Sequence, residues 1–232
     1  MAFENKNPVV SQSSAKEFQL KGVFGSPFPC LALTGGIACG KTTATRELEK
    51  LGWKVIDTDL IVRELYQPGN EGYKKVIDNF GPTVLNADNT LNRVALGQIV
   101  FSDPTQRHRL NALIHPLVRA VWQQRLVNHL RQFSEIPAVV VIPLLFEIEA
   151  ETAFQTVATV ACFLQTQLAR LEAAGFRREE ALQRIHAQGS LLKKIEQSHI
   201  VIWNNGNVEH MLGQVHRLDL LCRFHLTSFT KK

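Results

Sequence analysis

The sequence predicts an α/β fold, in which a parallel β-sheet is covered by helices on both faces. Three observations predict it. Residues 30–34 form an apolar run that stops at a glycine pair, residues 41–51 carry apolar side chains at helical spacing, and residues 54–57 form a second short strand. A strand, a helix and a strand in so short a stretch imply parallel pairing with a right-handed crossover.

The rest of the chain continues this alternation. Residues 60–130 are mostly helical, and residues 139–145 are uniformly apolar, as expected for a central parallel strand covered on both faces. Proline or glycine interrupts the helical stretch at Pro68-Gly69, Gly81-Pro82, Pro104 and His115-Pro116. A strand, a charged helical region, a last strand and a closing helix follow at 157–163, 165–194, 199–203 and 208–222.

Composition is typical of a globular protein with a full core. The chain has 232 residues, of which 45% are hydrophobic and 20% charged. No apolar run approaches the roughly 20 residues of a membrane span. The formal charge of +5 comes without a Lys/Arg run, so we expect neither a nucleic-acid partner nor membrane association. Scattered cysteines favour reduced thiols in a cytoplasmic protein: Cys30, Cys39, Cys162 and Cys222.

Residues 1–28 differ in composition from the rest of the chain, with serine and lysine mixed among glycine and proline. They lack the basic segment followed by an apolar core that marks a secretory signal. We therefore expect a flexible N-terminal extension over residues 1–28 and a single domain over residues 29–232. The sequence leaves a monomer and a small homo-oligomer equally open.

Residues 35–42, Gly-Gly-Ile-Ala-Cys-Gly-Lys-Thr, match the phosphate-binding-loop pattern GxxxxGK[ST] in full. Glycines let the backbone curl so that successive N–H groups point at phosphate oxygens, and the following helix N-terminus favours anions. We expect Lys41 to reach the β and γ phosphates of ATP and the Thr42 hydroxyl to bind Mg²⁺. The predicted ATP-binding residues of the loop are Gly35, Gly36, Ile37, Ala38, Cys39, Gly40, Lys41, Thr42 and Thr43.

The position of this motif between a strand and a helix favours a P-loop NTPase core over a glycine turn with an incidental lysine. A helix N-terminus can also favour the thiolate of Cys39. A small residue that merely fits the loop is the simpler interpretation of this cysteine.

An Asp-Thr-Asp sequence follows the second strand. The carboxyl ends of parallel strands face one crevice, so we expect Asp57 and Asp59 close to the γ phosphate. Two residues apart in an extended stretch, they can project to the same side. A kinase that acts on an alcohol needs a carboxylate to accept the hydroxyl proton. Surface turns and helix caps use the same residue types, but the nearby P-loop favours the catalytic interpretation.

Other P-loop classes fit the sequence less well. Residues 204–207, Asn-Asn-Gly-Asn, lack the lysine and aspartate of the NKxD guanine signature. The apolar strand at 139–142 runs into Pro-Leu-Leu-Phe-Glu and not into the aspartate of a Walker B site. A small-molecule kinase is therefore favoured, and a nucleotide-binding regulator without catalysis is an alternative.

With these motifs in place, the sequence resembles the dephospho-CoA kinase family over about residues 30–220. The likeness begins with Leu33-Thr34-Gly35-Gly36-Ile37, Gly40-Lys41-Thr42 and Asp57-Thr58-Asp59-Leu60-Ile61-Val62-Arg63. It continues in order with Pro68-Gly69, Phe80-Gly81, Leu91-Asn92-Arg93, His115-Pro116, Pro143-Leu144-Leu145-Phe146-Glu147, Gln167 with Arg170, Ala187-Gln188 and Asn205-Gly206.

The resemblance implies transfer of the ATP γ-phosphate, with Mg²⁺, to the ribose 3′-hydroxyl of dephospho-CoA. The product is coenzyme A, in the last step of its biosynthesis. The resemblance also implies a helical CoA-binding insertion at about 60–130 and a mobile lid at about 165–190. The family pattern favours the second aspartate as the base, which is Asp59 here, with Asp57 orienting Mg²⁺ or the base; the reverse assignment is the alternative.

The resemblance assigns the remaining site residues. Arg170 is implied to enter from the lid toward phosphate charge, a role suited to a planar guanidinium, and Asn205 and Gly206 to border the adenine. The implied catalytic set is Asp59, Asp57, Lys41 and Arg170, and the implied acceptor-binding set is Arg63, Arg93, His115 and Glu147. Plainer alternatives for the acceptor set are surface ion pairs for the arginines, packing for the histidine and a cap for the glutamate.

Overall fold

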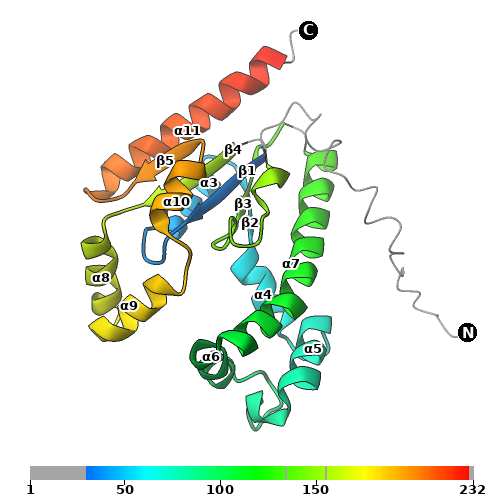
Figure 1. Ribbon diagram of the computed structural model, residues 1–232. Helices are drawn as coiled ribbons and strands as arrows, with labels where there is room; N and C mark the ends of the chain where they lie inside the picture. Colours follow the sequence, from blue (N-terminus) through cyan, green and yellow to red (C-terminus); the bar gives the residue numbers. More distant parts are fainter. Residues whose placement is uncertain (1–29, 134, 155, 230–232) are drawn as a thin grey trace, which may run out of the picture.

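The computed structural model describes residues 30–133, 135–154 and 156–229. Its strands form one parallel sheet, in the order β2-β3-β1-β4-β5 (Figure 1). They are β1 (Cys30–Gly35), β2 (Lys54–Asp57), β3 (Ala138–Val141), β4 (Thr156–Ala161) and β5 (Ile200–Trp203). The predicted extension at 1–28 lies outside the described residues.

Helices connect the strands and cover the sheet. Those before β3 are α3 (Lys41–Lys50), α4 (Thr58–Leu65), α5 (Glu71–Phe80), α6 (Arg93–Ser102) and α7 (Pro104–Gln132). Those after β4 are α8 (Leu164–Ala173), α9 (Arg178–His186), α10 (Leu191–Gln197) and α11 (Val208–Phe229). Short 3₁₀ turns occur at Pro82–Val84 and Glu151–Ala153.

The central strand β1 separates two hydrophobic cores, because successive side chains of a strand point to opposite faces. Cys30 and Ala32 pack with residues of α4 to α7, whereas Leu31 and Leu33 pack with residues of α3 and α11. All four side chains are buried. The sheet therefore lies between two helical layers, and the predicted three-layer α/β fold is confirmed.

Two groups of helices project from this core. In Figure 1, α5, α6 and the start of α7 extend beyond the sheet on one side, and α8 and α9 form a separate pair on the other. A small core of Leu168, Leu171 and Ala181 joins α8 to α9 and packs against Ile37 and Ala38 of the phosphate loop. These helices occupy the ranges predicted for the insertion and the lid.

Three expectations about the elements are wrong. β1 and β2 do not pair, since β3 lies between them; its uniformly apolar side chains suit that inner position. β3 also ends at Val141, short of residue 145, because Pro143 has no N–H for the ladder. Finally, α7 is not broken at Pro116 but runs through it, held by buried Ile114 and Val118 on its core side.

None of the helices in the described ranges combines the length and the apolar character that crossing a bilayer requires.

Candidate active site

The loop between β1 and α3 is tightly curled. Gly35 and Gly40 have φ angles of 144° and 103°, and Ala38 between them has 57°. A Cβ atom on Gly35 would lie 2.2 Å from the Val160 carbonyl oxygen, and one on Gly40 would lie 2.2 Å from Asn204 Nδ2. Only glycine fits at these two positions, because both the backbone conformation and the close approach exclude a side chain.

Each carbonyl oxygen of residues 35–40 accepts a hydrogen bond. The donors are Lys41 Nζ to Gly35 and Gly36 (both 2.9 Å), Gln167 Nε2 to Ile37 (2.8 Å), Arg170 Nη1 to Ala38 (2.9 Å), Asn204 Nδ2 to Cys39 (2.8 Å) and the Thr43 and Ala44 N–H groups to Gly40 (3.0 and 3.1 Å). The carbonyl side of the loop is therefore tied to the protein. The N–H groups of Lys41 and Thr42 precede the first hydrogen bonds of α3 and are available to an anion.

The charges of the two aspartates affect the pKa of Lys41, and the charge of Lys41 affects the pKa of Asp59. Burial is the main cause that lowers the pKa of Lys41, and the charge of Lys194 adds to it, while Asp59 and Asp57 oppose it. The carboxylates therefore lie close enough to the ammonium to influence its protonation. Asp57 and Asp59 thus act on Lys41 through their charges, and the shared catalytic role of the three residues stays a prediction.

Asp57 ends β2 and caps α4. Its Oδ1 accepts the Asp59 N–H at 2.8 Å, and Thr58 Oγ1 donates to the Val141 carbonyl at 2.8 Å, which ties the start of the helix to β3. The expectation of an extended stretch at 57–59 is wrong, because α4 already begins at Thr58. The cap interpretation of Asp57 holds, and Asp59 lies in the first turn of α4.

Asp59 has the electrostatics of a proton acceptor. Burial raises its pKa, and the neighbouring charge of Asp57 raises it further, whereas Lys41, Arg63 and Arg93 oppose the shift. A carboxylate with a raised pKa binds a proton more readily. The side chains of Arg63 and Arg93 are exposed, and their charges act on Asp59.

A cavity of about 440 Å³ lies at the N-terminus of α3. Its lining is Ala38, Gly40, Lys41, Thr42, Thr43, Arg170, Asn204, Gly206 and Val208. Arg170 enters from α8 and also donates from Nη2 to the Asn204 carbonyl at 3.0 Å. Asn205 is not part of this lining; its Oδ1 accepts from the Phe163 N–H and the Thr166 hydroxyl and so fixes the start of α8.

A second cavity, of about 430 Å³, lies between α7 and the segment that follows β3. Its lining is His108, Asn111, Ala112, His115, Pro116, Arg119, Leu144, Glu147 and Ile148. Of the predicted acceptor residues, His115 and Glu147 lie here. Arg63 and Arg93 are not part of this lining and are close to Asp59 instead.

The wall formed by α7 offers uncharged polar groups beside the charged Arg119. Burial lowers the pKa of His115, and the charge of Arg119 lowers it further, so the imidazole is neutral at pH 7. Pro116 has no N–H, so the Ala112 carbonyl one turn earlier lacks its helical donor. Both Ala112 and Pro116 line the cavity.

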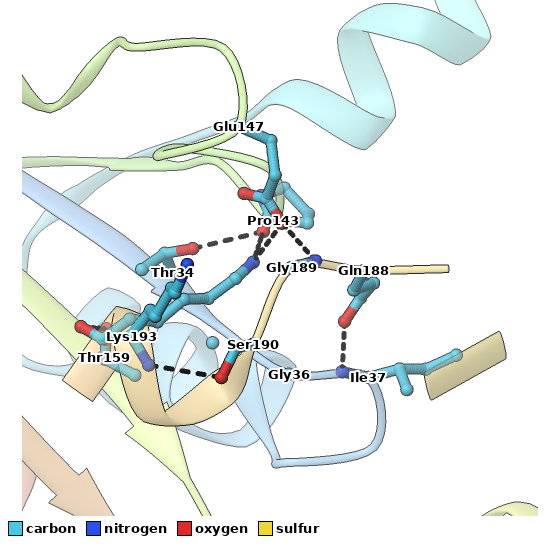
Figure 2. Close-up of polar contacts among 12 residues, drawn as sticks. Thr34, Gly36, Ile37, Pro143, Glu147, Thr159, Gln188, Gly189, Ser190 and Lys193 are labelled. Carbon is cyan, nitrogen blue, oxygen red and sulfur yellow. Dashed lines mark hydrogen bonds and ion pairs between the residues drawn. The ribbon is translucent and has the colours of Figure 1, made fainter. Parts of the chain in front are cut away.

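Glu147 is held from the other side of this cavity. Its Oε1 accepts the Gly189 N–H at 2.8 Å and pairs with Lys194 Nζ at 2.9 Å. Figure 2 shows Gly189 directed at Glu147, while the preceding Gln188 reaches Ile37 of the phosphate loop. Lys194 was not among the predicted site residues, since it is one lysine of a charged helical region.

Cys39 is buried and lies 3.6 Å from Cys162, measured between the sulfur atoms. The hydrogen bond from Cys162 is the main cause that lowers the pKa of Cys39, to about 7, and the charge of Lys41 acts in the same direction. Burial opposes the shift. The loop cysteine thus has thiolate character, but it is not open to solvent.

The oxygen groups near the loop fit Mg²⁺ bound together with ATP. In the part of the chain that the structure describes, no group of three or more His, Cys, Asp or Glu side chains can hold a metal ion. Thr42 lines the cavity at the N-terminus of α3, and the charges of Asp57 and Asp59 act on Lys41. Hydroxyl and carboxylate oxygens with phosphate and water complete the kind of ligand set that Mg²⁺ takes.

Comparisons with known proteins match this chain to one family. A family model described as dephospho-CoA kinase matches residues 29–210. A protein of that name from Bdellovibrio bacteriovorus is 39% identical over 188 residues, which are 81% of this chain and 93% of that protein. Another from Geobacter metallireducens is 42% identical over 187 residues, which are 80% and 92% of the two chains.

Solved structures share the fold. The crystal structure of a Thermus thermophilus protein superposes with a TM-score of 0.71 at 30% identity and covers 84% of this chain and 97% of its own. A structure of dephospho-CoA kinase from Campylobacter jejuni superposes with a TM-score of 0.61 at 23% identity, covering 82% and 95%.

Proposed function

We propose that this chain, which belongs to the dephospho-CoA kinase family, transfers the γ-phosphate of ATP to the ribose 3′-hydroxyl of dephospho-CoA. The observation that carries the proposal is the parallel sheet itself: the loop with Lys41 follows β1, and Asp57 and Asp59 lie at the end of β2 and just after it, at the same carboxyl edge. A phosphate-binding cation and a proton acceptor thus share one edge of the sheet, where their charges act on one another. Phosphoryl transfer to an alcohol requires both.

In this proposal ATP lies with its phosphates at the N-terminus of α3. The free N–H groups of the helix bind phosphate oxygens, and the Lys41 ammonium moves from the loop carbonyls to the β and γ phosphates. Thr42 provides a hydroxyl for Mg²⁺, which neutralises phosphate charge when bound. Arg170 adds positive charge from α8, where it already contacts Ala38 and Asn204.

Asp59 accepts the proton of the 3′-hydroxyl as its oxygen bonds to the γ phosphorus and the bond from that phosphorus to the bridging oxygen of ADP breaks. Asp57 supports it by fixing the first turn of α4 and by raising its pKa. Arg63 and Arg93 are suited to the diphosphate of the acceptor, because guanidinium groups bind phosphate with two parallel hydrogen bonds. Their charges already act on Asp59.

The 430 Å³ cavity is proposed to take another part of the acceptor. Its neutral His115, the Ala112 carbonyl and Glu147 supply hydrogen-bonding groups of the kind that an amide-bearing chain such as pantetheine requires. Closure of α8 and α9 over the phosphates would exclude water and limit hydrolysis of ATP.

An ADP-release assay with several acceptors tests the proposal. We expect turnover with dephospho-CoA and none with adenosine, AMP or pantetheine alone. Turnover on a nucleoside or nucleotide, with none on dephospho-CoA, would identify a different small-molecule kinase. Tight ATP binding without transfer to any of these acceptors would identify a nucleotide-binding regulator.

We also infer a cytoplasmic protein that acts on small molecules without a nucleic-acid partner, as a monomer or small homo-oligomer. The support is the composition described above and the four buried cysteines, all free thiols. Light scattering coupled to gel filtration measures the oligomeric state. A mobility-shift assay with random DNA at physiological salt is expected to give no complex.

A further inference from the structure

Lys194, on α10, is a buried charge. Its side chain is only 2% exposed, although lysine is almost never fully buried unless it is paired. Its ammonium donates to the Pro143 carbonyl at 2.7 Å and pairs with Glu147 at 2.9 Å. Neither the loop motif nor the aspartate motif requires this lysine, so its burial calls for a separate explanation.

The ammonium lies at the carboxyl edge of the sheet, behind the phosphate loop. The Pro143 carbonyl that it binds also accepts the Thr34 hydroxyl at 3.2 Å, and Thr34 directly precedes the first loop glycine. The charge of Lys194 also acts on Lys41. Lys194 thus contacts the segment after β3 at Pro143, where that segment is bonded to Thr34 of β1. The same segment forms one wall of the acceptor cavity.

The segment between α9 and α10 is tied to both proposed substrate sites by two consecutive residues. Gln188 Oε1 accepts the Ile37 N–H of the ATP loop at 2.8 Å, and the Gly189 N–H donates to Glu147 of the acceptor cavity at 2.8 Å (Figure 2). A Cβ atom on Gly189 would lie 2.8 Å from Glu147 Oε1. The contact with Glu147 therefore depends on glycine at this position.

We propose that Lys194 is a positioning residue, which holds Glu147 in the wall of the acceptor cavity and at the amide of Gly189. Through this pair, the segment between α9 and α10 is fixed to the acceptor cavity at Gly189 and, one residue earlier, to the ATP loop. The proposal rests on the proposed function for the identity of the acceptor.

Stability alone does not explain the pair. The desolvation of two charges in a buried salt bridge often cancels their attraction, so such a pair adds little to folding. Its specific effect is geometric, because the Glu147 carboxylate has one oxygen fixed by two donors. Glu147 is 27% exposed and lines the cavity, so its remaining hydrogen-bonding capacity is available to the acceptor.

The main test replaces Lys194 by methionine, with Lys193→Met as the matched control. Lys193 is exposed on the same helix, so the control removes the same charge from the surface. We expect Lys194→Met to raise KM for dephospho-CoA about tenfold, the size of one hydrogen bond to a charged group. KM for ATP should change by less than about threefold, and Lys193→Met should resemble the wild type. A lower melting temperature with unchanged KM for the acceptor would overturn the proposal.

Two further variants keep the test informative if Lys194→Met does not fold. Gly189→Ala retains both charges but removes the space for Glu147 Oε1, and should raise the acceptor KM in the same way. Lys194→Met combined with Glu147→Gln should be no worse than either single change, because residues in one network are not additive. Additive losses would contradict a shared role.

Hydrogen exchange separates this proposal from the proposed function. Wild-type turnover on dephospho-CoA tests the function by itself. The Gly189 amide should exchange about tenfold faster in Lys194→Met than in Lys193→Met, whatever the acceptor is, because its bound carboxylate is released. Equal exchange in the two variants would overturn the positioning role even if the wild type is an active kinase.

Discussion

The ATP loop and the acceptor cavity differ in how their polar groups are satisfied. Each loop carbonyl from Gly35 to Gly40 is bound by the protein, through donors that include Gln167, Arg170 and Asn204. The acceptor cavity instead has a carbonyl at Ala112 that lacks its helical donor. One site is thus shaped before its ligand binds, whereas the other keeps hydrogen-bonding capacity for its ligand.

This difference suits the two ligands. A triphosphate is recognised by a row of N–H groups and by charge, so the reverse face of the loop must be rigid. A longer acceptor is recognised by a few separate groups on different elements. We therefore expect changes in the loop to act mainly on kcat, and changes in the acceptor cavity to act mainly on the KM of the acceptor.

The largest effect is expected for Lys41→Ala. The ammonium stabilises charge that develops on the transferred phosphoryl group, so kcat should fall by at least about 10³-fold. The ADP-release assay measures it. Lys50→Ala is the control, since Lys50 ends the same helix, has a largely exposed side chain and pairs with Glu47. Unchanged turnover in Lys41→Ala would contradict the loop assignment.

Asp59→Asn should follow, with kcat lower by about 10² to 10⁴-fold and little change in ATP affinity, because it removes the base. Asp59 must be ionised to accept a proton, and its pKa is raised. The activity of the wild type should therefore begin to fall, on acidification, at a pH above the ordinary pKa of an aspartate. Asp57→Asn retains a helix cap but removes one negative charge. The acid limb of kcat/KM should therefore move to lower pH. A larger loss of kcat in Asp57→Asn would reverse the two roles.

Arg170→Lys should have an intermediate effect, a loss in kcat of about 10 to 100-fold. The planar guanidinium bonds the carbonyls of both Ala38 and Asn204, and one ammonium cannot reproduce both contacts while facing a phosphate. Arg178→Lys is the matched control, because Arg178 forms a surface ion pair with Glu172. Equal activity of the two variants would show that Arg170 only supports the loop backbone.

The loop and the aspartates could be picked out in the sequence because the chemistry that they suggest is local. Consecutive amides after a strand, a lysine and a hydroxyl are all specified within residues 35–43. The local geometry of Asp57 was predicted incorrectly, since two residues of spacing do not distinguish an extended chain from a helix cap. The order of the strands was equally inaccessible, because β3 enters between β1 and β2 from more than 80 residues along the chain.

Residues fixed only by tertiary contacts could not be predicted from one sequence. Lys194 is one of two adjacent lysines, and only packing against Pro143 and Glu147 makes it the buried one. Asn204 offered a weak signal, since it follows the last strand and precedes the predicted Asn205. In the structure it is Asn204, and not Asn205, that lines the cavity at the N-terminus of α3.

Pro116→Ala should sharpen the contrast between the two sites. An alanine N–H can bond the Ala112 carbonyl, so the helix should gain about 1–3 kcal/mol of stability. The same bond occupies an acceptor in the cavity wall, so KM for dephospho-CoA should rise about fivefold, the value of one hydrogen bond. Thermal melting and the ADP-release assay measure the two effects. Pro104→Ala, at the first position of α7, is the control. A gain in stability without a change in KM would remove this carbonyl from the acceptor site.

The smallest effect on activity is expected from the pair Cys39 and Cys162, which changes reactivity instead. Because the pKa of Cys39 is lowered to about 7, alkylation by iodoacetamide should rise with pH through that value. Cys162→Ala removes the hydrogen bond and should move the midpoint to higher pH. ATP should slow the reaction by holding the loop closed over the buried sulfur. Peptide mass spectrometry measures it, with Cys222, whose pKa burial raises to about 11, as the internal control. Equal rates with and without ATP would mean that nucleotide binding does not restrict the loop.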